Sequence, residues 1–314
     1  MEKSNKYERK KYVDFDLLLD SIQELDLSSI EWLIENVSYQ YYEYIKHFRS
    51  LSLESQVQLL DMAWQEELIA NQAMEGETKK GHLLEYVQDI KQGQESISKL
   101  TNLFGRYGKI EIRDLQRLHT LLLRGTTLEK NQNYLFRSND QKWVGYVEED
   151  GKPCVQYIPP RAYKIKHYLR KILTYVNDLE NVGTIENPKL LYEEYDNHLE
   201  TYGYSIFVKP TLIHVLLSVL QPFDDGNTRL ARLIQEVKIY QETNRLFQLK
   251  TSPKRLPYLY LSQRYYQRGP FYRSQMADIA QSPTNENWKS FIYMNLGCVE
   301  EEINVMQHTL KYFK

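Results

Sequence analysis

Residues 220–232, LQPFDDGNTRLAR, decide the fold, because they join two helix-forming segments through one tight polar turn. The preceding stretch, residues 211–220, is almost continuously apolar and rich in leucine, a composition that predicts a buried central helix. Gly226 marks the turn, and the next helix is expected to begin near Asn227. The sequence therefore predicts a buried helix, a polar turn and a second helix at the centre of the protein.

The polar turn has the features of an anion-binding site. Gly226 allows a ligand to approach the backbone closely, and the N–H groups at the start of the next helix favour negative charge. Arg229 and Arg232 add cationic charge suited to phosphate, and Asp225 supplies a hard oxygen ligand suited to Mg²⁺. The alternative is a helix-capping turn with an Asp–Arg pair at the surface, and both interpretations are open at this point.

Most of the remaining chain has helical periodicity. Apolar residues at helical spacing predict amphipathic helices over residues 26–50, 53–74, 82–104, 112–123 and 161–179. Residues 134–157 differ, because β-branched and aromatic residues flank an Asp-Gly turn, which predicts a β-hairpin. The predicted fold class is therefore mainly α with one small sheet element.

Composition argues against several classes of protein. A net charge of −2 argues against a general nucleic-acid-binding role, because such proteins carry a basic face. No apolar run in the sequence is long enough to cross a bilayer. The two cysteines, Cys154 and Cys298, exclude a disulfide scaffold and are typical of the cytoplasm. The sequence therefore predicts a cytoplasmic globular protein with neither a nucleic-acid nor a membrane partner.

Residues 221–232 resemble the Fic motif, H-x-F-x-[DE]-G-N-[GK]-R-x-x-R. The motif residues present in this sequence are Phe223, Asp225, Gly226, Asn227, Arg229 and Arg232. Two positions depart from the motif, since Gln221 stands in place of the histidine and Thr228 in place of glycine or lysine. On these residues the chain is similar to proteins of the Fic family.

The resemblance extends over about residues 65–275, through further segments in the family's order. Residues 67–76 are similar to the family's inhibitory segment, [ST]-x-x-x-E-[GN], in which Glu75 and Gly76 match and Asn71 replaces serine or threonine. Residues 136–145 resemble the family's flap, and its matching residues are Arg137, Trp143, Val144 and Gly145. The segment after the family's core is similar to residues 260–272.

The resemblance implies a helical bundle around a central helix-turn-helix anion site, with one β-hairpin as a flap. The implied organisation is an N-terminal helical region at 1–64, a Fic-like domain at 65–275 and a C-terminal helical extension at 276–314. Within the domain, residues 65–80 form the inhibitory helix, residues 134–158 the flap and residues 221–232 the motif.

Fic proteins typically transfer AMP from ATP to a protein hydroxyl, so the resemblance implies ATP and Mg²⁺ as cofactors. Asp225 is then expected to hold Mg²⁺. The implied phosphate-binding residues are Gly226, Asn227, Thr228, Arg229 and Arg232. Tyr260 and Tyr272 are candidates for an adenine pocket or, at their helical spacing, for the core.

The family's inhibitory segment implies self-inhibition in the same chain. Glu75, supported by Asn71 and Gly76, is expected to pair with Arg232 and to exclude the γ-phosphate of ATP. The flap is implied to bind an unidentified target protein as an added strand, through main-chain hydrogen bonds.

The two departures from the motif leave the activity open. A side-chain amide cannot act as a base, so Gln221 predicts that AMP transfer is weak or lost. Thr228 is expected to stiffen the turn and to crowd the path of the phosphates. Three hypotheses follow: an ATP–Mg²⁺-binding protein with impaired AMP transfer, an enzyme with altered nucleotidyl or phosphate-group transfer or AMP removal, and a non-catalytic peptide-binding module that uses the flap.

Overall fold

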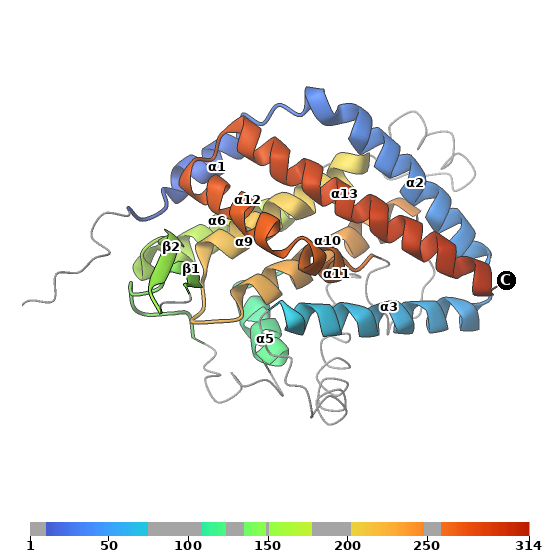
Figure 1. Cartoon of the computed structure of the whole chain (residues 1–314), viewed down its shortest axis with the longest axis horizontal. Helices are drawn as coiled ribbons and strands as arrows, with labels where there is room; N and C mark the ends of the chain where they lie inside the picture. Colours follow the sequence, from blue (N-terminus) through green and yellow to red (C-terminus); the bar gives the residue numbers. More distant parts are fainter. Residues whose placement is uncertain are drawn as a thin grey trace, which may run out of the picture.

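The computed structural model describes residues 11–74, 109–123, 135–148, 151–177, 202–247 and 259–313 (Figure 1). This part of the chain is mainly helical. Its helices are α1 (Phe15–Gln23), α2 (Glu31–Ser50), α3 (Leu53–Ala73), α5 (Ile112–Leu123), α6 (Ile165–Asn177), α9 (Lys209–Leu220), α10 (Asn227–Phe247), α11 (Ser262–Gln267), α12 (Gly269–Gln281) and α13 (Asn285–Leu310). Short 3₁₀ turns cover Ser28–Ile30, Ala162–Lys164 and Lys311–Phe313, and a π-helical turn covers Tyr204–Val208.

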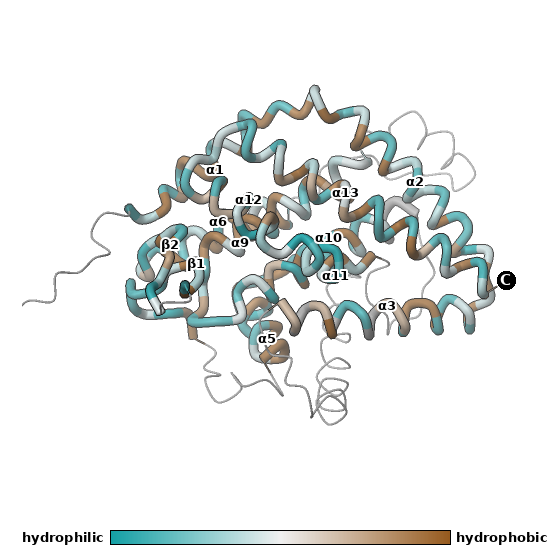
Figure 2. Tube along the Cα trace, in the orientation of Figure 1, coloured by the Kyte–Doolittle hydropathy of each residue, from teal (hydrophilic) through white to brown (hydrophobic). Residues whose placement is uncertain are grey.

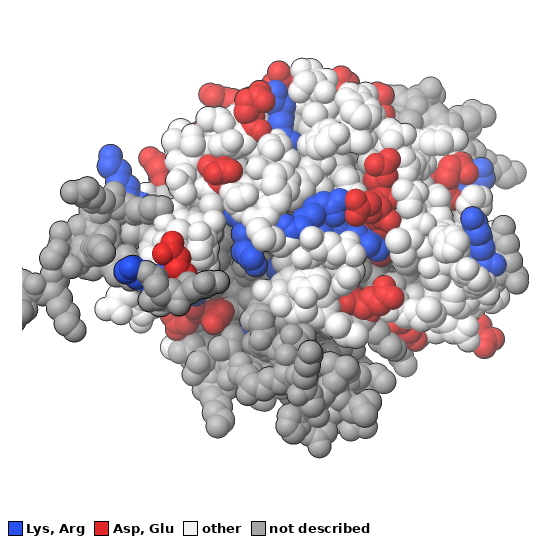
Figure 3. Space-filling model, viewed as in Figure 1, with Lys and Arg blue, Asp and Glu red and all other residues white. Residues whose placement is uncertain are grey.

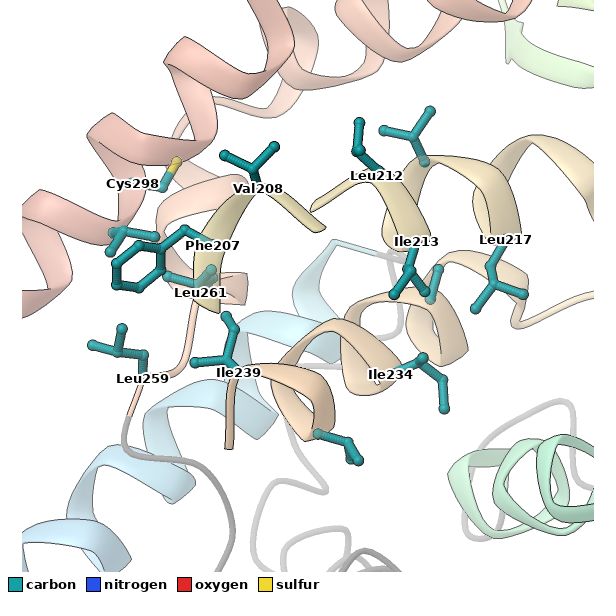
Figure 4. Packing of buried hydrophobic residues seen from close by; sticks show 14 of the residues in the cluster. Phe207, Val208, Leu212, Ile213, Leu217, Ile234, Ile239, Leu259, Leu261 and Cys298 are labelled. Carbon is teal, nitrogen blue, oxygen red and sulfur yellow. The ribbon is translucent and has the colours of Figure 1, made fainter. Parts of the chain in front are cut away.

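The predicted buried central helix is confirmed as α9. Each of its residues is buried, including the polar Thr211, His214 and Ser218. After the polar turn, α10 packs back along α9. Figure 4 shows Ile213 and Leu217 of α9 extending toward α10. Removing this continuous aliphatic surface from water is the main force that fixes the two helices on either side of the turn.

The N-terminal and C-terminal helices share the core of the motif helices. α2 and α13 pack against each other, and Figure 1 shows them together on one side of α9. Phe15 of α1, Tyr41 of α2 and Trp288 of α13 belong to the same buried apolar cluster as Leu216 of α9. Figure 2 shows hydrophilic and hydrophobic residues alternating along these outer helices, as expected of amphipathic helices with one solvated face.

The predicted hairpin is confirmed as two antiparallel strands, β1 (Val144–Val147) and β2 (Pro153–Tyr157). Their pairing has a bulge between Val144 and Gly145. At the turn, Gly151 has a φ of 78°, a left-handed conformation that glycine adopts without strain. After β2, the N-terminal segment binds the hairpin, because Val13 N–H donates to the carbonyl of Ile158 at 2.9 Å.

The structure differs from the predicted helices in two ways. The helix predicted from residue 26 begins at Glu31, because residues 28–30 form a 3₁₀ turn whose first N–H, on Ser28, donates to the Asp26 carboxylate. Helix α1 has no counterpart among the predicted helices. The predicted helix at 82–104 lies outside the described residues. None of the described helices combines the length and the apolar character that a membrane span requires.

Candidate functional site

The polar turn between α9 and α10 has an unusual backbone. α9 ends at Leu220, and Gln221 caps it in the left-handed conformation with φ 48° and ψ 61°. Gln221 is the one non-glycine residue with positive φ in the described part of the chain. This conformation costs a non-glycine residue roughly 1–2 kcal/mol, so the surrounding contacts have to impose it.

The side chain of Gln221 is held at both ends of its amide. Nε2 donates to the carbonyl of Ser218 at 2.7 Å, and Oε1 accepts from Asn227 Nδ2 at 3.0 Å. Gln221 is 6% exposed. The residue at the position of the motif histidine therefore closes the turn instead of presenting a group to a substrate.

The side chain of Asn227 closes the same turn from the inside through hydrogen bonds. Its Oδ1 accepts from the N–H of Phe223 at 2.8 Å, and its Nδ2 donates to the Phe223 carbonyl at 2.9 Å as well as to Gln221. Each polar atom of this side chain is thus bound within the turn. Any contribution of Asn227 to anion binding has to come from its backbone N–H, which as the first of a helix has no acceptor within α10.

Helix α5 packs against the turn through His119. The ring of His119 stacks on Phe223 with ring centroids 3.8 Å apart, and its Nε2–H donates to the Asp225 carbonyl at 2.7 Å. Gly226 has a φ of 70°, and a Cβ there would lie 2.9 Å from Leu123 Cδ2. Glycine is therefore required at this position by the backbone and by the packing of α5. Burial lowers the pKa of His119, which keeps the ring neutral.

The charged residues of the turn divide into exposed acids and buried bases. Asp224 and Asp225 are exposed, Thr228 is half-buried, and Arg229 and Arg232 are each only 1% exposed. The carboxylate of Asp225 accepts the N–H of Gly226 at 2.7 Å, so its Oδ1 is fixed at the mouth of the turn. The predicted surface Asp–Arg pair does not describe this arrangement, because both arginines lie inside the protein.

Arg137 ties the flap to the turn. Its guanidinium donates to the carbonyls of Gln221 at 2.7 Å, Asn139 at 3.2 Å and Leu220 at 3.5 Å, and also to the carbonyl of Pro160. Its backbone N–H donates to Pro222 at 3.0 Å. These acceptors include the last carbonyls of α9, where the helix dipole favours a cation. Arg137 is 3% exposed, so it acts here as a brace between segments.

The other predicted flap residues lie in or beside β1. Trp143, Val144 and Gly145 are half-buried. A Cβ on Gly145 would overlap the carbonyl oxygen of Cys154 on the paired strand, so only glycine permits this close pairing. The hairpin also contacts the motif, because the hydroxyl of Tyr157 donates to the same Ser218 carbonyl that binds Gln221.

Tyr260 and Tyr272 lie in the core, 3% and 2% exposed. The hydroxyl of Tyr272 donates to His214 Nε2 at 2.7 Å, and His214 Nδ1 binds Gln235 Oε1 at 2.7 Å. Burial, with the charge of Arg232 second, lowers the pKa of His214 to about 3, so its ring is neutral. Of the two roles that the sequence left open, a place in the core matches the position of both tyrosines. Their contact with adenine stays a prediction.

The predicted inhibitory residues Glu75 and Gly76 lie outside the described residues, as does the side chain of Asn71. Sequence reasoning missed two parts of the site. It gave His119 no role at the turn and placed Arg137 only on the flap. A histidine within the amphipathic helix predicted at 112–123 was the available signal for the first, and no local pattern signals the second. Within the described residues, no group of three His, Cys, Asp or Glu side chains is placed to hold a metal ion.

Comparison with known proteins gives one family. The model of the Fic/DOC family matches residues 109–237, which include α5, the hairpin, α9 and the motif turn. No curated protein matches the chain. The family match ends within α10, so it leaves α1 to α3 and α11 to α13 to the structural comparison.

Solved Fic structures share the fold over most of the chain. A Fic-family protein from Desulfovibrio desulfuricans is 19% identical with a TM-score of 0.57, covering 88% of this chain and 74% of that one. A Fic-domain signalling protein from Bacteroides thetaiotaomicron is 13% identical with a TM-score of 0.58, covering 89% and 98%. Fic-1 from C. elegans is 15% identical with a TM-score of 0.59, covering 92% and 75%. At these identities the likeness shows the fold alone.

Proposed function

We propose, because the Fic/DOC family model matches residues 109–237, that the chain binds ATP–Mg²⁺ at the 221–232 turn and transfers AMP weakly or not at all. Domains of this family generally transfer AMP or another nucleotide to proteins. The observation that carries the proposal is the pair of hydrogen bonds that hold the Gln221 amide inside the turn. The turn keeps the family's phosphate-binding residues and lacks its base.

The described residues fit a magnesium-bound polyphosphate. Asp225 presents an exposed carboxylate, one oxygen of which is oriented by the N–H of Gly226. The first N–H groups of α10 open toward the same turn, and Arg229 lies in this first turn of the helix with Arg232 one turn further along. When bound there, Mg²⁺ would neutralise phosphate charge. Asp225 would hold the cation and the N-terminus of α10 would hold the phosphates, with the positive charge of the buried Arg229 and Arg232 behind it.

The neighbouring histidines do not replace the missing base. The Nε2 of His119 donates to the Asp225 carbonyl, and burial disfavours the protonated ring. His214 lies within α9, where both of its ring nitrogens are bound by Tyr272 and Gln235. The His119 ring is 4% exposed and stacks on Phe223, and both ring nitrogens of His214 are bound, so neither ring is presented to an attacking hydroxyl at the turn. Loss of a general base typically lowers the rate by 10²- to 10⁴-fold.

Two further parts of the proposal concern partners and control. In the described sheet, β1 pairs with β2 alone, so its outer edge can accept an extended segment of a target protein. Glu75 follows α3, and α3 packs against α11 and reaches α10 through Glu67. The position of α3 beside α10 supports a pairing of Glu75 with Arg232, which would exclude the γ-phosphate of ATP from the site. The resulting protein is a self-inhibited nucleotide-binding Fic protein in the cytoplasm.

The experiment that tests the missing base is self-labelling with ATP carrying a radioactive α-phosphate. The variants are Glu75→Gly alone, Glu75→Gly with Gln221→His, and the matched control Glu75→Gly with Gln221→Asn, which keeps an amide. We expect labelling in the histidine variant to exceed that of the other two by about 100-fold or more. Equal labelling in Glu75→Gly alone would instead favour an enzyme with altered chemistry. Silence in the histidine variant, with ATP still bound, would contradict the role assigned to Gln221.

A further inference from the structure

Two glutamates from different helices meet inside the protein. Glu67 of α3 and Glu236 of α10 are each 2% exposed. Glu67 Oε2 accepts the backbone N–H of Ser262 at 2.8 Å, and the Glu236 carboxyl accepts the backbone N–H of Leu261. Both carboxyl groups therefore bind consecutive residues at the start of α11. Figure 4 shows Leu259 and Leu261 of this segment close to Ile239 of α10.

The two carboxyl groups also face each other. Their side chains lie within hydrogen-bonding reach, and the Oε1 atoms of Glu67 and Glu236 are both buried without a donor from any other residue. Two ionised carboxylates offer acceptors only, so neither can satisfy the other. A single proton held between the two carboxyl groups converts this repulsion into a hydrogen bond and supplies a donor that no other residue provides.

The charges around the pair compensate one negative charge and leave the second uncompensated. Arg232 lies four residues before Glu236 on α10, and its positive charge favours ionisation of Glu236. Burial and the charge of Glu67 oppose it more strongly and raise the pKa of Glu236. The other titratable groups that face the pair or its neighbours from the surrounding elements are Tyr44, Asp61, Glu66, Tyr260, Arg264 and Glu302.

We propose that one proton shared by Glu67 and Glu236 locks α3 onto α10 and α11, and that α3 loosens when this proton is lost as pH rises. The closed state holds one proton more than the loosened state, in which both carboxyls are solvated. The lock is therefore complete at low pH and weakens as pH rises. Because α3 ends two residues before Glu75, the lock would set how firmly the helix that precedes this glutamate is held. That consequence rests on the proposed function, whereas the lock itself does not.

Hydrogen–deuterium exchange of the full chain between pH 5.5 and 8.5 tests the lock. Peptides from α3 are compared with peptides from α9 in the same sample, which removes the intrinsic pH dependence of exchange. We expect the protection of α3, relative to α9, to fall by up to about tenfold per pH unit, the slope for one proton released on opening. In Glu236→Gln the amide supplies a permanent donor, so α3 is expected to stay protected across the range.

Two further variants keep the test decisive. Glu67→Gln places the donor on the other helix and is expected to behave like Glu236→Gln, which covers the failure of either variant to fold. Glu302→Gln removes the neighbouring carboxyl and is expected to keep the wild-type response of α3. Parallel pH dependence of α3 and α9 in the wild type would overturn the proposal, as would a wild-type response in both Gln variants. An ATP titration on the same samples separates the two hypotheses, because the lock can hold without ATP binding and ATP can bind without the lock.

Discussion

Gln221 and Asn227 bind each other across the motif turn, with Asn227 Nδ2 3.0 Å from Gln221 Oε1. The contact joins Gln221, the residue that caps α9, to the first residue of α10. It therefore holds the ends of the two helices together across the turn. It also uses the atoms that a catalytic side chain at residue 221 would need for a substrate. The glutamine that replaces the motif histidine is thus a structural part of the turn.

The first prediction concerns the strain and the contacts of Gln221. Gln221→Ala removes both amide hydrogen bonds and keeps the positive φ, so it is expected to lower the free energy of unfolding by about 1–2 kcal/mol. Gln221→Gly removes the same bonds but relieves the backbone, and it is expected to be more stable than the alanine variant by about 1 kcal/mol. Urea unfolding of both variants measures the difference. An alanine variant as stable as the wild type would show that the two hydrogen bonds of the Gln221 amide contribute nothing to stability.

A second prediction concerns the packing under the turn. Gly226→Ala places a Cβ 2.9 Å from Leu123 Cδ2 and 3.2 Å from His119 Nε2, at a positive φ. Gly151→Ala has a similar φ of 78° with nothing within 4 Å of the new Cβ. We expect Gly151→Ala to cost about 1 kcal/mol and Gly226→Ala clearly more, with a lower midpoint in thermal unfolding. Equal losses would mean that α5 moves away without cost.

The third prediction concerns Arg137. Arg137→Lys retains the charge but cannot donate to four carbonyls at once, so it is expected to lower the free energy of unfolding by about 2–3 kcal/mol. The exposed Arg161, whose guanidinium lies over the ring of Tyr12, serves as the matched control, and Arg161→Lys is expected to change stability by less than about 0.5 kcal/mol. Chemical denaturation distinguishes the two. A small effect at residue 137 would contradict its role as a brace.

A fourth prediction follows from Glu302. Burial raises the pKa of this carboxyl to about 7, although Arg264 Nε lies 3.0 Å from its Oε2. The native protein therefore holds a proton there that the unfolded chain releases near the ordinary pKa of glutamate. Stability from this group is full at low pH and is lost as pH rises through about 7. We expect stability to fall less between pH 5 and 8 in Glu302→Gln than in the wild type.

The neighbouring Glu301 is the control for that measurement. It pairs with Arg268 at the surface, and Figure 3 shows acidic and basic side chains side by side near the middle of the face in view. Glu301→Gln is expected to leave the pH dependence of stability as in the wild type. A slope that changes equally in both variants would contradict the burial argument.

Much of the fold could be predicted from the sequence, because local patterns encode it. The spacing of apolar residues gave α3, α5 and α6 to within a few residues, and the apolar run before the turn gave α9. The Asp-Gly turn gave the hairpin, and Gly226 with Asn227 gave the start of α10. These features depend on residues that are close in the sequence, where period and turn chemistry are informative.

The contacts of the site could not be predicted in the same way. Arg137 binds carbonyls of residues 220 and 221, more than eighty positions away, and a basic residue beside a flap gives no sign of such burial. Glu67 and Glu236 each resemble an ordinary helical surface residue in sequence, and only the packing of α3 and α10 brings them together. The role of Gln221 also depends on the fold, since a motif comparison registers the missing histidine but not the hydrogen bonds of the glutamine in its place.

The proposal that the turn binds ATP–Mg²⁺, and that Glu75 opposes this binding, can be measured on the purified protein. Calorimetric titration of ATP–Mg²⁺ into the wild type, Glu75→Gly, and Glu75→Gly with either Asp225→Ala or Asp224→Ala tests it most directly. We expect tighter binding in Glu75→Gly than in the wild type, a loss of more than about tenfold with Asp225→Ala, and little change with Asp224→Ala. No binding in any variant, or equal losses from the two aspartate substitutions, would contradict it.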